Sequence, residues 1–121
     1  MDKPKIVAID DTKFVCDTLS AWLKNEYDVV TFLSGKDGIA YLTENTADLL
    51  LLDYDMPGMT GYEVLMEIRI NKKTSKLPVI FLTGVTNERM EQEMMERGAD
   101  DYIHKPLEMS VLRERIKKHL I

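Results

Sequence analysis

Three aspartates follow short apolar segments, at places where their carboxylates could share one site. Asp10 and Asp11 follow the segment KIVAI, and Asp53 follows the four leucines of Leu49–Leu52. An unpaired carboxylate beside an apolar interior is costly, and clustered carboxylates raise one another's pKa unless a cation is present. Hard oxygen ligands of this kind suit Mg²⁺, and no histidine or cysteine stands at these two ends to favour zinc. The aspartates therefore predict a magnesium site.

Two further polar residues follow other apolar segments and complete a site for a phosphoryl group. Thr83 ends PVIFLT, and Lys105 follows DDYIH. The lysine could neutralise an anion beside the metal, and the threonine hydroxyl could donate a hydrogen bond to it. Phosphoryl transfer depends mainly on positioning and charge neutralisation, and a carboxylate can itself be the nucleophile. An aspartate at a strand end is often only a turn former, so the joint placement carries this hypothesis.

These residues need a framework that brings distant segments to one edge of a sheet. Strand-like and helix-like segments alternate along the whole chain. Such alternation predicts a mostly parallel sheet with helices on both faces. We expect strands at 5–10, 27–32, 47–53, 78–83 and 100–104, and helices at 13–25, 35–44, 61–70, 87–97 and 109–121.

The polarity of the five strands predicts their order in the sheet. The first, third and fourth are apolar throughout, which is typical of central strands, and the more polar second strand suits an edge. The predicted fold is α/β, a flavodoxin-like, doubly wound parallel sheet of order 2-1-3-4-5 with five helices. Ligands bind such sheets at the carboxyl ends of the strands, where the chain order reverses. Here that point lies between the strands that lead to Asp10 and Asp53.

Composition limits the classes of function. We expect residues 1–121 to form a single domain with one core, since 121 residues is near the commonest domain size. The net charge of −5 gives no electrostatic reason to bind nucleic acid or an anionic membrane. The single cysteine, Cys16, excludes an intrachain disulfide, and no apolar run approaches the length of a membrane span. We therefore expect a cytoplasmic protein.

The ordered set of motifs resembles the receiver domain of two-component response regulators, of the chemotaxis-regulator type, over essentially the whole chain. The matching segments are Asp10-Asp11, DYDMPGMTG from Asp53 to Gly61, Thr83-Gly84, and YIHKP from Tyr102 to Pro106. Each segment alone is a weak signal, whereas the set at this spacing is specific to the family.

The resemblance implies a role for each residue of the site. Asp53 would accept phosphate from a histidine on a partner protein. Asp10, Asp11 and Asp53 would hold Mg²⁺ together with the backbone carbonyl of Asp55. Lys105 would pair with the phosphate. The domain would then be a signalling phosphoacceptor rather than an enzyme, with only Mg²⁺-dependent self-phosphorylation and dephosphorylation.

The resemblance also implies a switch that follows phosphorylation. Thr83 would move toward the phosphate, and Tyr102 would turn inward to fill the space that Thr83 leaves. This favours one of two arrangements of the surface formed by the helix 87–97, the strand 100–104 and the helix 109–121. A ligand shifts such an equilibrium only by stabilising one state more than the other.

Other motif positions have structural or tuning roles in the family. Pro57 and Gly61 are structural, and the peptide bond before Pro106 is expected to be cis. Asp55 and Val85, each two positions beyond a site residue, vary in the family and tune the lifetime of the phosphate.

The expected partners are proteins. A sensor histidine kinase or a histidine phosphotransfer protein would supply the phosphate. A downstream protein or output domain would read the switching surface, with no direct contact to nucleic acid or membrane by this domain. A phosphorylation-dependent homodimer and a longer chain with an effector domain both stay open.

Two other interpretations compete with this one. DYD resembles the Asp-x-Asp motif of haloacid-dehalogenase-like phosphatases, but Pro57 stands where a threonine or valine is usual, and Asp53 closes a third strand instead of opening the fold. A pseudo-receiver would bind partners without phosphorylation, and the intact set of site residues argues against it.

Overall fold

The computed structural model describes residues 3–84 and 87–120, which form a parallel sheet with helices on both faces. The strand order is β2-β1-β3-β4-β5, as predicted. The strands are β1 Lys5–Ile9, β2 Asp28–Phe32, β3 Leu49–Asp53, β4 Val79–Thr83 and β5 Asp101–His104. The helices within the described residues are α1 Lys13–Leu23, α2 Gly35–Glu44, α3 Gly61–Ile70, α4 Glu88–Glu96 and α5 Met109–His119. None of these helices is long and apolar enough to cross a membrane.

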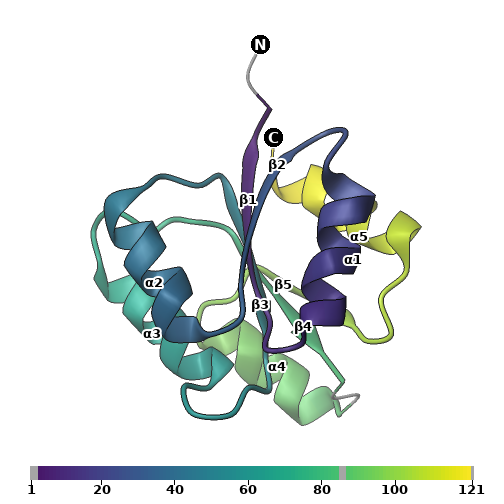
Figure 1. Cartoon of the computed structure of the whole chain (residues 1–121). Coiled ribbons are helices and arrows are strands. Elements are labelled where there is room, and N and C mark those ends of the chain that lie inside the picture. The colour runs from purple at the N-terminus through teal and green to yellow at the C-terminus, as the bar shows by residue number, and fades with distance from the viewer. Residues whose placement is uncertain (1–2, 85–86, 121) are drawn as a thin grey trace.

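Each face of the sheet has its own apolar core. Helices α1 and α5 cover one face, and α2, α3 and α4 cover the other (Figure 1). Successive side chains of a strand point to opposite faces, so Leu50 and Leu52 pack under α2 and α3 while Leu49 and Leu51 pack under α1 and α5. All four leucines are fully buried, which explains why β3 needs an uninterrupted apolar run.

The pattern of burial agrees with the predicted placement of the strands. The residues of β3 and β4 are buried throughout, whereas those of the edge strand β2 are partly or fully exposed. We expected the first strand to end at Asp10, but β1 ends one residue earlier, at Ile9. The reason is local, because the Asp10 carboxylate accepts the Thr12 backbone N–H at 2.9 Å and begins the turn into α1.

The start of α3 is fixed tightly against the end of β3. Thr60 and Glu63 form a capping box, in which each side chain accepts the backbone N–H of the other at 3.2 and 3.1 Å. Gly61 follows the cap, and a Cβ there would lie 2.7 Å from the Asp53 carbonyl oxygen and 2.9 Å from the Phe81 ring. Glycine therefore lets the helix approach the strand that carries Asp53.

The close approach at Gly61 predicts that Gly61→Ala lowers the free energy of unfolding by about 1–3 kcal/mol, because the added methyl group has no space. Urea denaturation monitored by circular dichroism measures this loss. Gly84→Ala is the matched control, since a Cβ at Gly84 meets no heavy atom within 4 Å. Equal stability of the two variants would contradict this account of α3.

Candidate functional site

The three aspartates predicted to share a site do lie together, at the carboxyl ends of β1 and β3. These strands are neighbours, with Ile9 paired to Leu52. One carboxylate oxygen from each of Asp10, Asp11 and Asp53 lies within 4.8 Å of the others. Asp10 is 0% and Asp53 3% exposed, whereas Asp11 is exposed. The cluster is therefore embedded in the sheet edge and reached from the side of Asp11.

Lys105 contacts two of these carboxylates. Its ammonium group lies 2.9 Å from Asp10 Oδ2 and 3.2 Å from Asp53 Oδ1. Burial acts to lower the pKa of Lys105, but the hydrogen bonds and charges of Asp10 and Asp53 outweigh burial and raise that pKa. Lys105 therefore stays a cation, and it ties the loop after β5 to the ends of β1 and β3.

One lysine does not balance three carboxylates. Burial, and then the charge of Asp10, raise the pKa of Asp53 from 3.8 to about 6, although Lys105 acts in the opposite direction. The Asp53 carboxylate is thus held in an environment that disfavours its charge. A second cation would relieve this repulsion, and carboxylate oxygens open to solvent on one side are ligands that Mg²⁺ accepts. The donor set fits the predicted metal.

Thr83 and Tyr102 occupy different positions relative to this cluster. Thr83 ends β4 at the same sheet edge, is 1% exposed, and its backbone carbonyl accepts the Lys105 N–H at 2.7 Å. Tyr102 lies on β5, and its hydroxyl donates to Glu91 of α4 at 3.1 Å. Sequence analysis did not single out Glu91, because nothing distinguishes it from the other glutamates of this acidic helix.

The remaining predicted residues lie around the site. The Asp55 backbone N–H donates to Asp53 Oδ1 at 3.3 Å, and the residue itself is exposed, as is Pro57. The peptide bond between Lys105 and Pro106 is cis, as the resemblance implies. Val85 lies outside the described residues.

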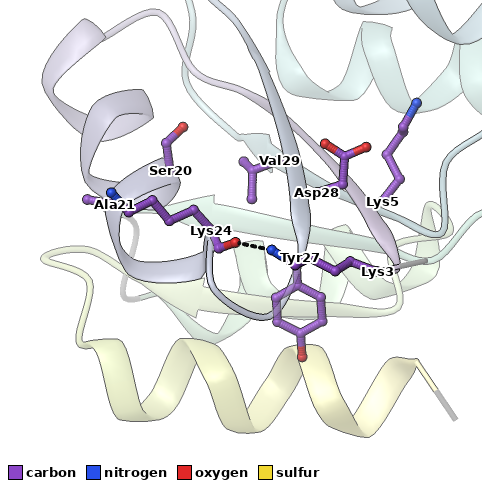
Figure 2. Close-up of a pocket in the computed structure, with 8 residues that line it drawn as sticks. All are labelled: Lys3, Lys5, Ser20, Ala21, Lys24, Tyr27, Asp28 and Val29. Atoms are coloured by element: carbon purple, nitrogen blue, oxygen red, sulfur yellow. Dashed lines mark hydrogen bonds between the residues drawn. The ribbon is translucent and has the colours of Figure 1, made fainter. Parts of the chain in front are cut away.

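A separate cavity of about 930 Å³ lies on the other side of the molecule, beside the start of β2 (Figure 2). Two of the three lysines that line it, Lys3 and Lys5, have side-chain hydrogen-bond partners. The Lys3 ammonium donates to the carbonyl of Lys24 at the end of α1 at 2.9 Å, and Lys5 donates to the Tyr41 hydroxyl at 2.8 Å. The contacts of Lys3 and Lys5 are structural, so we place the chemistry at the aspartate cluster.

Comparison with known families shows which family the chain belongs to. A family model described as the response regulator receiver domain matches residues 6–117. The chain belongs to this family. Receiver domains are signalling phosphoacceptors rather than enzymes with substrate turnover, and the aspartate cluster lies where the sheet of this receiver domain has its switch in chain order.

The relatives of this receiver domain differ in length and setting. It is 40% identical over 115 residues to a probable cyclic di-GMP phosphodiesterase of Vibrio cholerae serotype O1. The matched segment covers 95% of this chain but only 26% of that protein. The chain thus spans about a quarter of that relative. The chemotaxis protein CheY4 of Vibrio cholerae has the same fold, with a TM-score of 0.93, 27% identity, and coverage of 98% of this chain and 99% of that one.

A third relative is the receiver domain of the sensor histidine kinase PA1611 from Pseudomonas aeruginosa PAO1. Its structure has a TM-score of 0.89 and 22% identity, and the match covers 98% of each chain. That structure holds a magnesium ion coordinated in its active site cleft. At this level of identity the likeness concerns the fold alone.

The raised pKa of Asp53 predicts that, without divalent cations, Asp53→Asn is more stable than the wild type at about pH 7. The carboxyl has a pKa of about 6 in the folded chain and an ordinary value of 3.8. Its ionisation therefore lowers wild-type stability as the pH rises between these values. The full shift of about 2 pH units corresponds to up to about 3 kcal/mol. Urea denaturation at several pH values measures the difference.

The part of this difference that comes from ionisation should be lost below about pH 3, where Asp53 is protonated in both the folded and the unfolded state. Added Mg²⁺ should reduce the difference at about pH 7. Asp55→Asn alters an exposed neighbour and keeps Asp53, so its stability should fall with pH as that of the wild type does. A gap between Asp53→Asn and the wild type that is equal at both pH values would contradict the assigned cause.

Proposed function

We propose that this receiver domain accepts a phosphoryl group on Asp53 from the phosphohistidine of a sensor histidine kinase or histidine phosphotransfer protein, in a Mg²⁺-dependent reaction. The observation that carries the proposal is the cluster of Asp10, Asp11 and Asp53, with Lys105 in contact with two of its members. An acid-rich site with one fixed cation and a solvent-facing side suits the transfer of an anionic group between proteins.

The chemistry follows from the positions of these groups. A carboxylate oxygen of Asp53 attacks phosphorus, and an oxygen–phosphorus bond forms as the nitrogen–phosphorus bond breaks. The histidine nitrogen leaves with the electron pair of that bond, as a neutral imidazole whose other ring nitrogen keeps its proton. Asp10, Asp11, Asp53 and the backbone carbonyl of Asp55 would hold Mg²⁺, which when bound neutralises phosphoryl oxygens. The Asp55 N–H and the Lys105 ammonium both contact Asp53 Oδ1, so they orient the carboxylate before transfer.

The proposed consequence of phosphorylation is a population shift of the surface formed by α4, β5 and α5. Thr83 would move toward the phosphoryl oxygens, and Tyr102 would turn inward. Among the described residues of α4, only Met94 is buried, so little apolar contact holds this helix in one place. A downstream protein, an output domain or a second copy of the chain would read the altered surface. Asp55 and Val85 would tune the lifetime of the phosphate.

The setting of the domain is also a proposal. We infer that residues 1–121 act as one receiver domain in the cytoplasm. The relative that is 40% identical carries the name of a probable cyclic di-GMP phosphodiesterase. For a longer protein that contains this chain, we therefore propose control of cyclic di-GMP hydrolysis as the output.

Phosphorylation by acetyl phosphate tests the central proposal. The wild type should gain one phosphoryl group in the presence of Mg²⁺ and none after chelation with EDTA. Asp53→Asn should gain none, because the nucleophile is lost, and intact mass spectrometry measures both. Asp55→Asn is the matched control and should still accept phosphate, since the proposed ligand at Asp55 is a backbone carbonyl.

Two outcomes would count against this function. Labelling of Asp53→Asn to the level of the wild type would place the acceptor elsewhere. Repeated turnover of p-nitrophenyl phosphate, abolished by Asp53→Asn, would instead favour the phosphatase interpretation of the DYD motif.

A further inference from the structure

One carboxylate, that of Glu91, joins α4 to β5 through two side chains. Its Oε1 accepts the Tyr102 hydroxyl at 3.1 Å, and its Oε2 lies 2.8 Å from His104 Nε2. Tyr102 and His104 are two positions apart on β5, so they share a face of the sheet. Their rings meet edge to face, with centroids 5.6 Å apart. Tyr102, His104 and Glu91 therefore form one connected group, which we call the Glu91 bridge.

The bridge matters because α4 has few other anchors. Met94 is the buried residue of the helix, and Met95 is 42% exposed. The Glu91 side chain is only 17% exposed, so its hydrogen bonds form in partial shelter from water. Hydrogen bonds to a charged acceptor are stronger than neutral ones. The contact with β5 thus depends substantially on a single glutamate.

The bridge also lies beside the proposed phosphorylation site. His104 pairs with Thr83 across β4 and β5, and the next residue, Lys105, donates its backbone N–H to the Thr83 carbonyl. A movement of Thr83 or Lys105 would therefore be transmitted to the bridge directly through His104, which is a neighbour of both residues.

From this geometry we infer that Glu91 is a positioning residue that holds Tyr102 against α4 and thereby opposes the arrangement favoured by phosphorylation. The inference rests on the proposed function, because the inward turn of Tyr102 belongs to that proposal. His104 is the second anchor and fixes the orientation of the carboxylate. Burial, followed by the bond to Glu91, raises the pKa of the Tyr102 hydroxyl, so the hydroxyl remains a donor to Glu91.

The energetic consequence can be measured as a change in affinity. If Tyr102 must leave Glu91 when a phosphoryl group binds, part of the binding free energy is used to break that bond. A hydrogen bond of ordinary net strength corresponds to about a fivefold change in an equilibrium constant. Removing the bridge should therefore tighten the binding of a phosphoryl mimic.

Titration with beryllofluoride in the presence of Mg²⁺ tests this inference. Glu91→Ala should bind about fivefold more tightly than the wild type. Glu91→Gln, whose amide oxygen can still accept the Tyr102 hydroxyl, should stay closer to the wild type. Glu96→Ala is the matched control, because Glu96 is exposed on the same helix and pairs within it to Gln92. It should bind as the wild type does.

Two further measurements separate positioning from a general loss of structure. Without ligand, the amide NMR signals of β5 in Glu91→Ala should lie shifted toward their beryllofluoride-bound positions. If Glu91 acts through the Tyr102 hydroxyl, Glu91→Ala and Tyr102→Phe should have non-additive effects, with the double variant resembling either single variant.

The outcomes distinguish this inference from the proposed function. Unchanged or weakened beryllofluoride binding by Glu91→Ala, with normal wild-type binding that requires Asp53, would overturn the role of Glu91 alone. Absence of Mg²⁺-dependent binding to the wild type would overturn the proposed function, and the role of Glu91 with it.

Discussion

The excess of negative charge at the carboxyl edge of the sheet is the constraint on which the rest of the structure depends. Three carboxylates share a space less than 5 Å across, two of them nearly inaccessible to water, and one ammonium group contacts two of them. Such an arrangement opposes folding, as the raised pKa of Asp53 shows. It can persist only because the strands that carry these groups are held by other forces. The fully buried residues of β1 and β3, packed on both faces of the sheet, supply them.

The elements around this edge are held with unequal firmness, more tightly beside β3 than beside β5. On the side of β3, the buried leucines, the capping box at Thr60 and the close approach at Gly61 hold Asp53 in one position. On the side of β5, α4 rests on Met94 and the Glu91 bridge. This arrangement suits the proposed signal, because a local change in charge at Asp53 would then shift the weakly attached helix and leave the site intact.

The sequence was sufficient for the fold and for the position of the aspartate cluster, because both follow from periodic patterns. Apolar runs identify the central strands, and parallel strands have their carboxyl ends on the same side of the sheet. Asp10 and Asp53, which follow two neighbouring strands, therefore lie close together however the helices are oriented. The Glu91 bridge could not be predicted in this way. It depends on how α4 is rotated against β5, and an acidic helix whose one buried residue within the described part of the chain is Met94 does not fix that rotation. The end of β1 also depends on a local side-chain contact, since the Asp10 carboxylate accepts the Thr12 backbone N–H and begins the turn into α1.

The charges at the site also explain why the proposed function would use both a metal and a lysine. With Mg²⁺ bound, the two cations together match the three carboxylates. The proposed phosphorylation would replace the single charge of Asp53 by a group that carries roughly two negative charges. The site would then have an unmatched negative charge that neither Lys105 nor Mg²⁺ could cover, and a hydrogen bond from a nearby hydroxyl would stabilise it. Thr83 ends β4 at this edge, with its backbone bonded to Lys105. The phosphorylated site would therefore need one more hydrogen-bond donor. The movement of Thr83 to supply that hydrogen bond is how phosphorylation would act on β4, β5 and the Glu91 bridge.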